Sequence, residues 1–81
     1  MVEPLELRVR RVVSSVLGLP LERVTLSTSN DDVENWDSLL IINLLMAIEA
    51  EFEVSLTPEE AGGLLSVELI VQLLREKGLH A

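Results

Sequence analysis

The chain has 81 residues, no cysteine and a net charge of −8, from 14 acidic and six basic residues. A chain of this length forms one domain, which we expect to span residues 1–81. Without cysteine it has neither disulfides nor thiolate metal ligands, and its acidic balance argues against nucleic acid as a partner, because neutralising phosphates requires Lys and Arg.

The distribution of apolar and charged residues predicts a cytoplasmic, monomeric protein that does not insert into a membrane. No uninterrupted apolar run approaches the roughly 20 residues needed to cross a bilayer. Glu3, Pro4 and Glu6 stand where a signal peptide would be basic and then apolar. Every charged residue between Val24 and Leu74 is acidic, a field of one sign that would attract basic partners. The alternative is a generic acidic surface that aids solubility.

Apolar residues recurring three and four positions apart predict a first helix over residues 5–17. Gly18 can adopt the left-handed conformation that closes a helix, and Pro20 cannot continue one. The connection that follows, residues 19–36, is long for a compact domain and rich in turn-forming Ser, Thr, Asn and Asp. We expect a short helical turn near residues 20–24. Four apolar side chains are expected to hold this connection to the core: Leu21, Val24, Leu26 and Val33.

The second predicted helix, residues 38–52, carries two apolar stripes on nearly opposite sides. One has the helical spacing of a core face and consists of Ile41, Leu44, Leu45, Ile48 and Phe52. The other is formed by Leu39, Ile42 and Met46, and we expect it to remain exposed as a docking surface for another protein. The alternative is that the second stripe packs under the long connection.

Local signals also place the last two helices. Thr57, Pro58 and Glu60 form a capping box with proline at the first helical position, and Gly62-Gly63 should end that short helix early. Ser66 caps a final helix that ends at Gly78. The sequence therefore predicts an all-α fold, a four-helix bundle of three long helices and one short, with a long loop between helices one and two.

Ser38 stands at the start of the second helix, where backbone N–H groups lack partners and the helix dipole is positive. A phosphate on its hydroxyl would be electrostatically favoured there, so Ser38 is a candidate attachment point for an anion. The alternative is that Asp37 or Ser38 merely caps the helix. We expect Trp36 to cover the core beside this position.

This arrangement resembles the acyl carrier protein family, also called phosphopantetheine-attachment domains. The resemblance covers nearly the whole chain: W-D-S-L at residues 36–39, E-A-E-F at 49–52, T-P-E-E at 57–60 and the final helix. It implies that Ser38, between Asp37 and Leu39, carries a 4'-phosphopantetheine arm that a phosphopantetheinyl transferase installs from coenzyme A. The arm's thiol would hold acyl groups as thioesters.

In this family, partner enzymes with basic docking patches bind the second helix, and they belong to fatty acid, lipid, polyketide or related biosynthesis. The family's docking positions correspond here to Leu39, Ile42, Met46, Glu49 and Glu53, flanked by Asp31, Asp32 and Asp37. Family members that sequester an acyl chain hold it between helices, and the corresponding walls are Leu44, Leu45, Ile48, Leu64 and Ile70.

The sequence departs from carriers of fatty acid synthesis along the second helix, where Leu40, Ile41, Asn43 and Ala50 occupy stretches usually richer in acids. This favours a specialised stand-alone carrier. The alternatives are an aminoacyl or peptidyl carrier and an unmodified acidic helical module that binds a partner. An enzyme is disfavoured, because a serine nucleophile needs a positioned base and the only histidine, His80, lies near the chain end. We expect no metal site.

Overall fold

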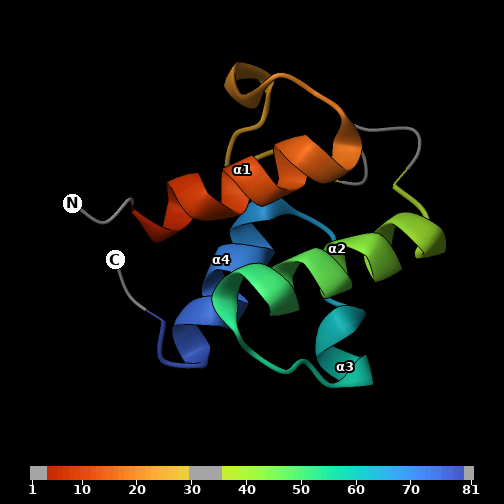
Figure 1. The fold of residues 1–81 in the computed structure, drawn as a ribbon, viewed down its shortest axis with the longest axis vertical. Helices are drawn as coiled ribbons and strands as arrows, with labels where there is room; N and C mark the ends of the chain where they lie inside the picture. The colour runs from red at the N-terminus through yellow and green to blue at the C-terminus, as the bar shows by residue number, and fades with distance from the viewer. Residues whose placement is uncertain (1–3, 30–35, 80–81) are drawn as a thin grey trace.

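Helices account for all the regular elements in the part of the chain that the computed structural model describes, residues 4–29 and 36–79. Their order is α1 (Leu5–Leu17), the 3₁₀ turn η1 (Leu21–Arg23), α2 (Ser38–Phe52), α3 (Pro58–Ala61) and α4 (Val67–Glu76). In Figure 1, α1 packs against both α2 and α4, while short α3 lies beside α2. The predicted all-α fold, with three long helices and one short, is confirmed.

The helix ends follow from local chemistry. Gly18 adopts φ 70°, and its N–H donates to the Ser14 carbonyl at 2.9 Å, which closes α1. Thr57 and Glu60 form the predicted capping box of α3, which ends before Gly62. Ser66 caps α4 by accepting from the Leu69 N–H at 3.1 Å.

The core lies where α1, α2 and α4 meet. On α2 the most buried side chains follow a four-residue spacing, Leu40, Leu44, Ile48 and Phe52, whereas Ile41 and Leu45 are only partly buried. The predicted core face is therefore correct for Leu44, Ile48 and Phe52. Leu40 is buried in place of Ile41 and Leu45, so the buried face is turned slightly around the helix axis from the prediction. The other fully buried apolar side chains are Leu5, Val9, Val13, Val24, Leu64, Val67, Ile70 and Leu74.

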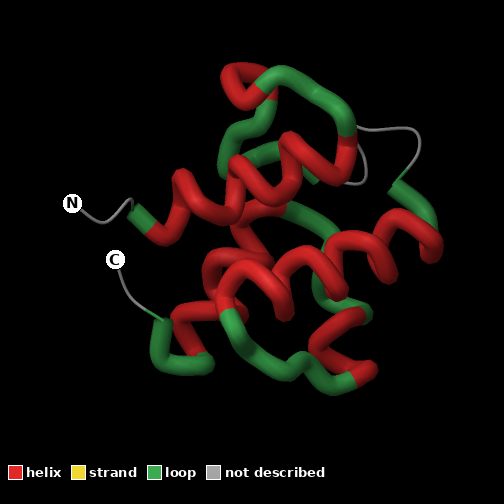
Figure 2. The backbone as a smooth tube through the Cα atoms, viewed as in Figure 1, coloured by secondary structure: helices red, strands yellow, loops and turns green. Residues whose placement is uncertain are grey.

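The connection after α1 is fastened to two helices. The Arg10 guanidinium on α1 donates to the carbonyls of Val24 at 2.6 Å and Leu21 at 3.4 Å. Farther along, the Thr28 and Leu26 carbonyls accept from the first N–H groups of α4. Figure 2 shows the described part of this connection as the mostly green tube that follows α1. Val24 is buried as predicted, but the prediction for Leu26 was wrong. Its side chain is exposed, and the attachment is made instead by its carbonyl, which accepts from the Glu68 N–H at 3.2 Å. Val33 lies outside the described residues.

Candidate functional site at the start of helix α2

Ser38 is the first residue of α2, and its side chain is exposed. Asp37 precedes it in an extended conformation, and its carboxylate accepts from the Leu40 N–H at 3.1 Å. The Asp37 carbonyl accepts from Ile41 at 3.0 Å. Asp37 is therefore the helix cap, and the Ser38 hydroxyl is not used for capping.

Two backbone N–H groups beside the Ser38 hydroxyl are available to bind an acceptor. Within the described part of the chain, the backbone N–H groups of Ser38 and Leu39 have no acceptor. Helix α4 differs, because its first four N–H groups bond to Thr28, Leu26 and the side chain and carbonyl of Ser66. Unsatisfied donors at a helix start favour an anion, so the residues around Ser38 fit a covalently attached phosphate.

Trp36 holds the residue stretch just before α2 against the core. Its ring is buried, and its indole N–H donates to the Leu64 carbonyl at 2.9 Å. The prediction that Trp36 covers the core beside Ser38 is thereby confirmed. This contact joins the residues just before α2 to the segment between α3 and α4, so the start of α2 has a defined position on the core.

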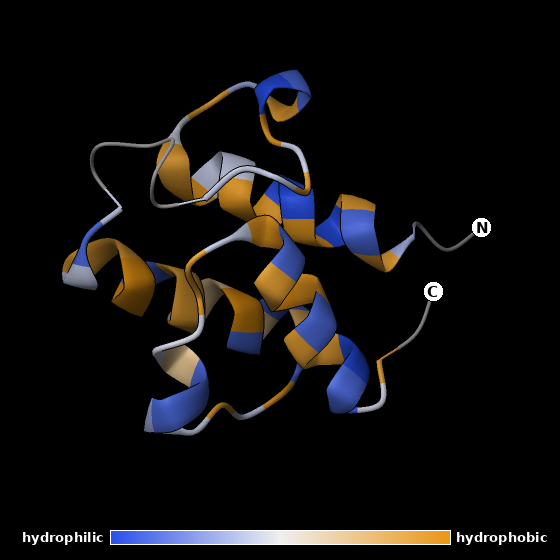
Figure 3. Ribbon diagram, turned by 180° about the vertical axis from the view of Figure 1, so that it is seen from behind, coloured by the Kyte–Doolittle hydropathy of each residue, from blue (hydrophilic) through white to orange (hydrophobic). Residues whose placement is uncertain are grey.

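The second apolar stripe of α2 is exposed. Leu39, Ile42 and Met46 have 66%, 51% and 64% of their surface accessible, so no described part of the long connection covers them. We call these three residues the α2 strip. Figure 3 shows that hydrophobic residues dominate most of this helix. Such an exposed apolar surface beside Ser38 is suited to binding another protein.

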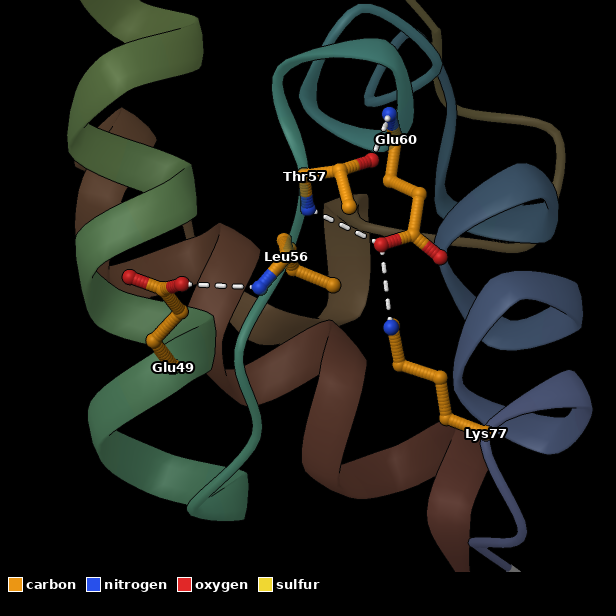
Figure 4. Close-up of polar contacts among 5 residues, drawn as sticks. All are labelled: Glu49, Leu56, Thr57, Glu60 and Lys77. Carbon is orange, nitrogen blue, oxygen red and sulfur yellow. Dashed lines mark hydrogen bonds and ion pairs between the residues drawn. The ribbon is translucent and has the colours of Figure 1, made fainter.

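The acids predicted around the strip have different environments. Glu49 is partly buried, and its carboxylate accepts from the Leu56 N–H at 2.8 Å (Figure 4). Glu53 is exposed and ends α2 in the left-handed conformation, with φ 53°. Asp31 and Asp32 lie outside the described residues. Sequence reasoning missed the Glu49 contact, which depends on how the chain returns after α2.

The residues predicted to line an acyl pocket are packed together. Leu44, Ile48, Leu64 and Ile70 have no accessible surface, and Leu45 is partly buried. An acyl chain could enter between them only if the helices separate. An open groove of about 380 Å³ lies elsewhere, between α1 and α2, where Arg8, Val12 and Ala47 are among its lining residues.

Comparison with known proteins decides the family. The family model described as "Phosphopantetheine attachment site" matches residues 7–74. The chain belongs to the acyl carrier protein family. It is 33% identical over 72 residues to the acyl carrier protein of Buchnera aphidicola subsp. Baizongia pistaciae (strain Bp), covering 89% of this chain and 92% of that protein. The acyl carrier protein of Buchnera aphidicola subsp. Schizaphis graminum (strain Sg) is 31% identical, with 89% and 91% covered.

Membership in the acyl carrier protein family confirms 4'-phosphopantetheine as the cofactor. Proteins of this family carry groups for other enzymes and do not themselves catalyse, and their interactions are with a phosphopantetheinyl transferase and acyl-processing enzymes. Within residues 4–29 and 36–79, no helix is long and apolar enough to cross a membrane. The same residues contain no group of three His, Cys, Asp or Glu that could hold a metal ion.

Proposed function

We propose that Ser38 is the attachment point of the phosphopantetheine arm and that this carrier presents acyl groups to partner enzymes through the α2 strip. The observation that supports this most is the exposed Ser38 hydroxyl beside two unpaired backbone N–H groups. When attached, the arm supplies a flexible thiol that holds an acyl group as a thioester. Ser38 needs no activating base of its own, because the transferase that modifies it can provide one.

The residues around Ser38 have separate tasks in this proposal. The N–H groups of Ser38 and Leu39 stabilise the negative charge of the phosphodiester. Asp37 holds the first turn of α2 in place through Leu40. The α2 strip supplies an apolar contact for the partner, while the negative charges of Glu53, Asp31 and Asp32 attract its basic groups.

We also propose that this carrier serves a specialised pathway of lipid, polyketide or related biosynthesis. Support comes from α2, where the three exposed apolar side chains of the strip give a less charged docking surface than an acid-rich helix would. An aminoacyl or peptidyl cargo is the alternative. The intact mass of the protein purified from its own cells would distinguish the two kinds of cargo, because it reports the group bound to the arm.

We also propose that the carrier is a monomer in the cytoplasm. The net charge of −8 supports a monomer, because it opposes self-association. Location in the cytoplasm stays a prediction from the sequence.

The attachment is tested by incubating the protein with coenzyme A and a broad-specificity phosphopantetheinyl transferase. We expect a mass gain of one phosphopantetheine group, and we expect Ser38→Ala to abolish it while the helical circular dichroism spectrum is retained. Ser55→Ala is the matched control, because Ser55 is also exposed but lies outside a helix. An unmodified wild-type protein would refute the proposal and favour a helical interaction module without a cofactor.

A further inference from the structure

A second surface of the molecule lies between α1 and α2, which run side by side in Figure 1. Its wall on α1 consists of residues spaced three and four positions apart, namely Arg8, Arg11, Val12, Ser15 and Val16. On α2 the small side chains of Ala47 and Ala50 leave the space between the helices open. We call this space the α1–α2 groove. It follows α1 over residues 8–16, which is about 12 Å or two helical turns, so it has the length to receive a short helix.

The Arg8 guanidinium is held in place at this groove. It lies over the Phe52 ring, 4.6 Å from the ring centroid, and its Nη2 donates to the Glu51 carbonyl at 3.4 Å. The ion pair with Glu51 Oε1 is long, 3.8 Å, and both side chains are partly exposed, so this pair contributes little. Among the described residues, no acceptor bonds to Nε or Nη1 of Arg8. A guanidinium that stacks on a ring and keeps these donors is preorganised to bind a carboxylate.

The α1–α2 groove differs in charge from the rest of the molecule. It contains two of the six basic residues, Arg8 and Arg11, and one acid, Glu51. Every charged residue between Val24 and Leu74, by contrast, is acidic. A smaller groove between α3 and α4 is lined by three glutamates and no basic residue. An acidic ligand is therefore attracted to the α1–α2 groove and repelled by the acids elsewhere on the carrier.

Apolar side chains complete the groove. Val12 and Val16 are partly buried, and Ala50 is exposed. Ala50 lies four residues after Met46, so the groove borders the α2 strip without including it. An occupant must offer apolar side chains to the two valines and a carboxylate to Arg8. A helix with an apolar stripe bordered by Asp or Glu meets both requirements.

We propose that the α1–α2 groove is a second docking surface, which binds an acidic amphipathic helix of a partner protein. Arg8 donates from Nε and Nη1 to a carboxylate on that helix, and Arg11 adds positive charge. Val12 and Val16 contact its apolar stripe. The surface contains neither Ser38 nor the α2 strip, so it goes beyond the function proposed above. On the strip the carrier supplies acids to a basic partner, whereas in the groove these charges are reversed.

The test uses two synthetic helical peptides of about 15 residues, the length at which isolated helices become populated in water. Both have leucine at every third or fourth position. The acidic peptide has glutamate beside the leucines, and the basic peptide has lysine at the same positions. Each is titrated into the complete isotope-labelled chain and followed by NMR. We expect the acidic peptide to shift the amide signals of Val12, Ser15 and Ala47 more than that of Met46, and the basic peptide to leave the three groove signals unchanged.

Substitutions separate the groove from general charge effects. Arg8→Gln should weaken binding of the acidic peptide by about tenfold or more, as loss of a charged hydrogen bond implies. Arg23→Gln is the matched control, because it removes the same charge at an exposed position outside the groove, and it should bind as the wild type does. Ala50→Gln places a larger side chain in the groove at an exposed position. It should weaken binding without disturbing the core, even if Arg8→Gln alters the packing on Phe52.

Several results would overturn this proposal. The groove is not a site for an acidic helix if the acidic peptide shifts none of its signals, or if Arg8→Gln and the unsubstituted protein bind that peptide equally well. Groove signals that shift with protein concentration alone would assign the groove to a second copy of the chain. Shifts of the same signals by decanoate but not by the acidic peptide would assign it to a single-chain amphiphile. Modification of Ser38 tests the carrier proposal separately, because Ser38 lies outside the groove.

Discussion

Glu60 shows how a single partly buried carboxylate joins two elements of this carrier. The backbone N–H of Thr57 donates to it and Lys77 pairs with it, and in that order these contacts lower the pKa of Glu60 below its ordinary value of 4.5. The folded protein therefore favours the ionised form. The ionised Glu60 carboxylate therefore stabilises the fold at any pH above the pKa that Glu60 has in the unfolded chain. This stabilisation is lost as the pH falls through the lower pKa that Glu60 has in the folded protein.

We accordingly expect Glu60→Gln to be less stable than the wild type at pH 7, with the difference shrinking below about pH 4. Thermal unfolding of both proteins at pH 7 and pH 3 measures this. Glu59→Gln serves as control, because Glu59 is exposed and has no hydrogen bond in the described structure. A Glu60→Gln deficit that is the same at both pH values would contradict the assignment.

At the scale of elements, Arg10 holds the first part of the connection between α1 and α2. This side chain donates to the carbonyls of Val24 and Leu21. Arg10→Met keeps an apolar stem but leaves both carbonyls without their donor, so we expect a loss of about 1–3 kcal/mol in the free energy of unfolding, measured with urea. Arg23→Met should cost much less, because Arg23 is exposed and makes no such bond. Equal losses in the two variants would show that Arg10 does not hold the connection.

The ends of the elements could be predicted from the sequence because each is determined by neighbours. Gly18, Thr57 and Ser66 act on residues at most four positions away. Arg10, Glu49 and the Glu60–Lys77 pair act between elements, so their partners depend on how the helices pack. The same distinction explains the candidate site. The exposed Ser38 hydroxyl follows from its place as the first residue of α2, whereas the hydrogen bond of Glu49 to Leu56 has no local signal.

Across the whole molecule, the proposed docking divides the work of binding a partner between charge and apolar surface. The net charge of −8 attracts basic proteins over distance and weakens with salt. In the same proposal, the α2 strip acts only at contact, where burial of apolar surface depends little on screening by salt. The exposure of the strip was predictable, because a small helical domain cannot bury two opposite faces of one helix. The tight packing that leaves Leu44 and Ile48 without accessible surface was not predictable, since packing density depends on all neighbours.

This division predicts how modification of Ser38 responds to substitution. We expect Met46→Gln to lower kcat/KM of a broad-specificity transferase by roughly tenfold or more, because burying an apolar side chain of this size at an interface contributes about 1.5–3 kcal/mol. The fold should be unaffected, since 64% of Met46 is accessible. Raising the salt concentration should lower kcat/KM for both proteins while the ratio between them stays constant. Leu69→Gln, at a 44% exposed position on α4, is the control and should behave as the wild type. If Met46→Gln and Leu69→Gln are modified equally well, the strip is not the surface that the transferase contacts.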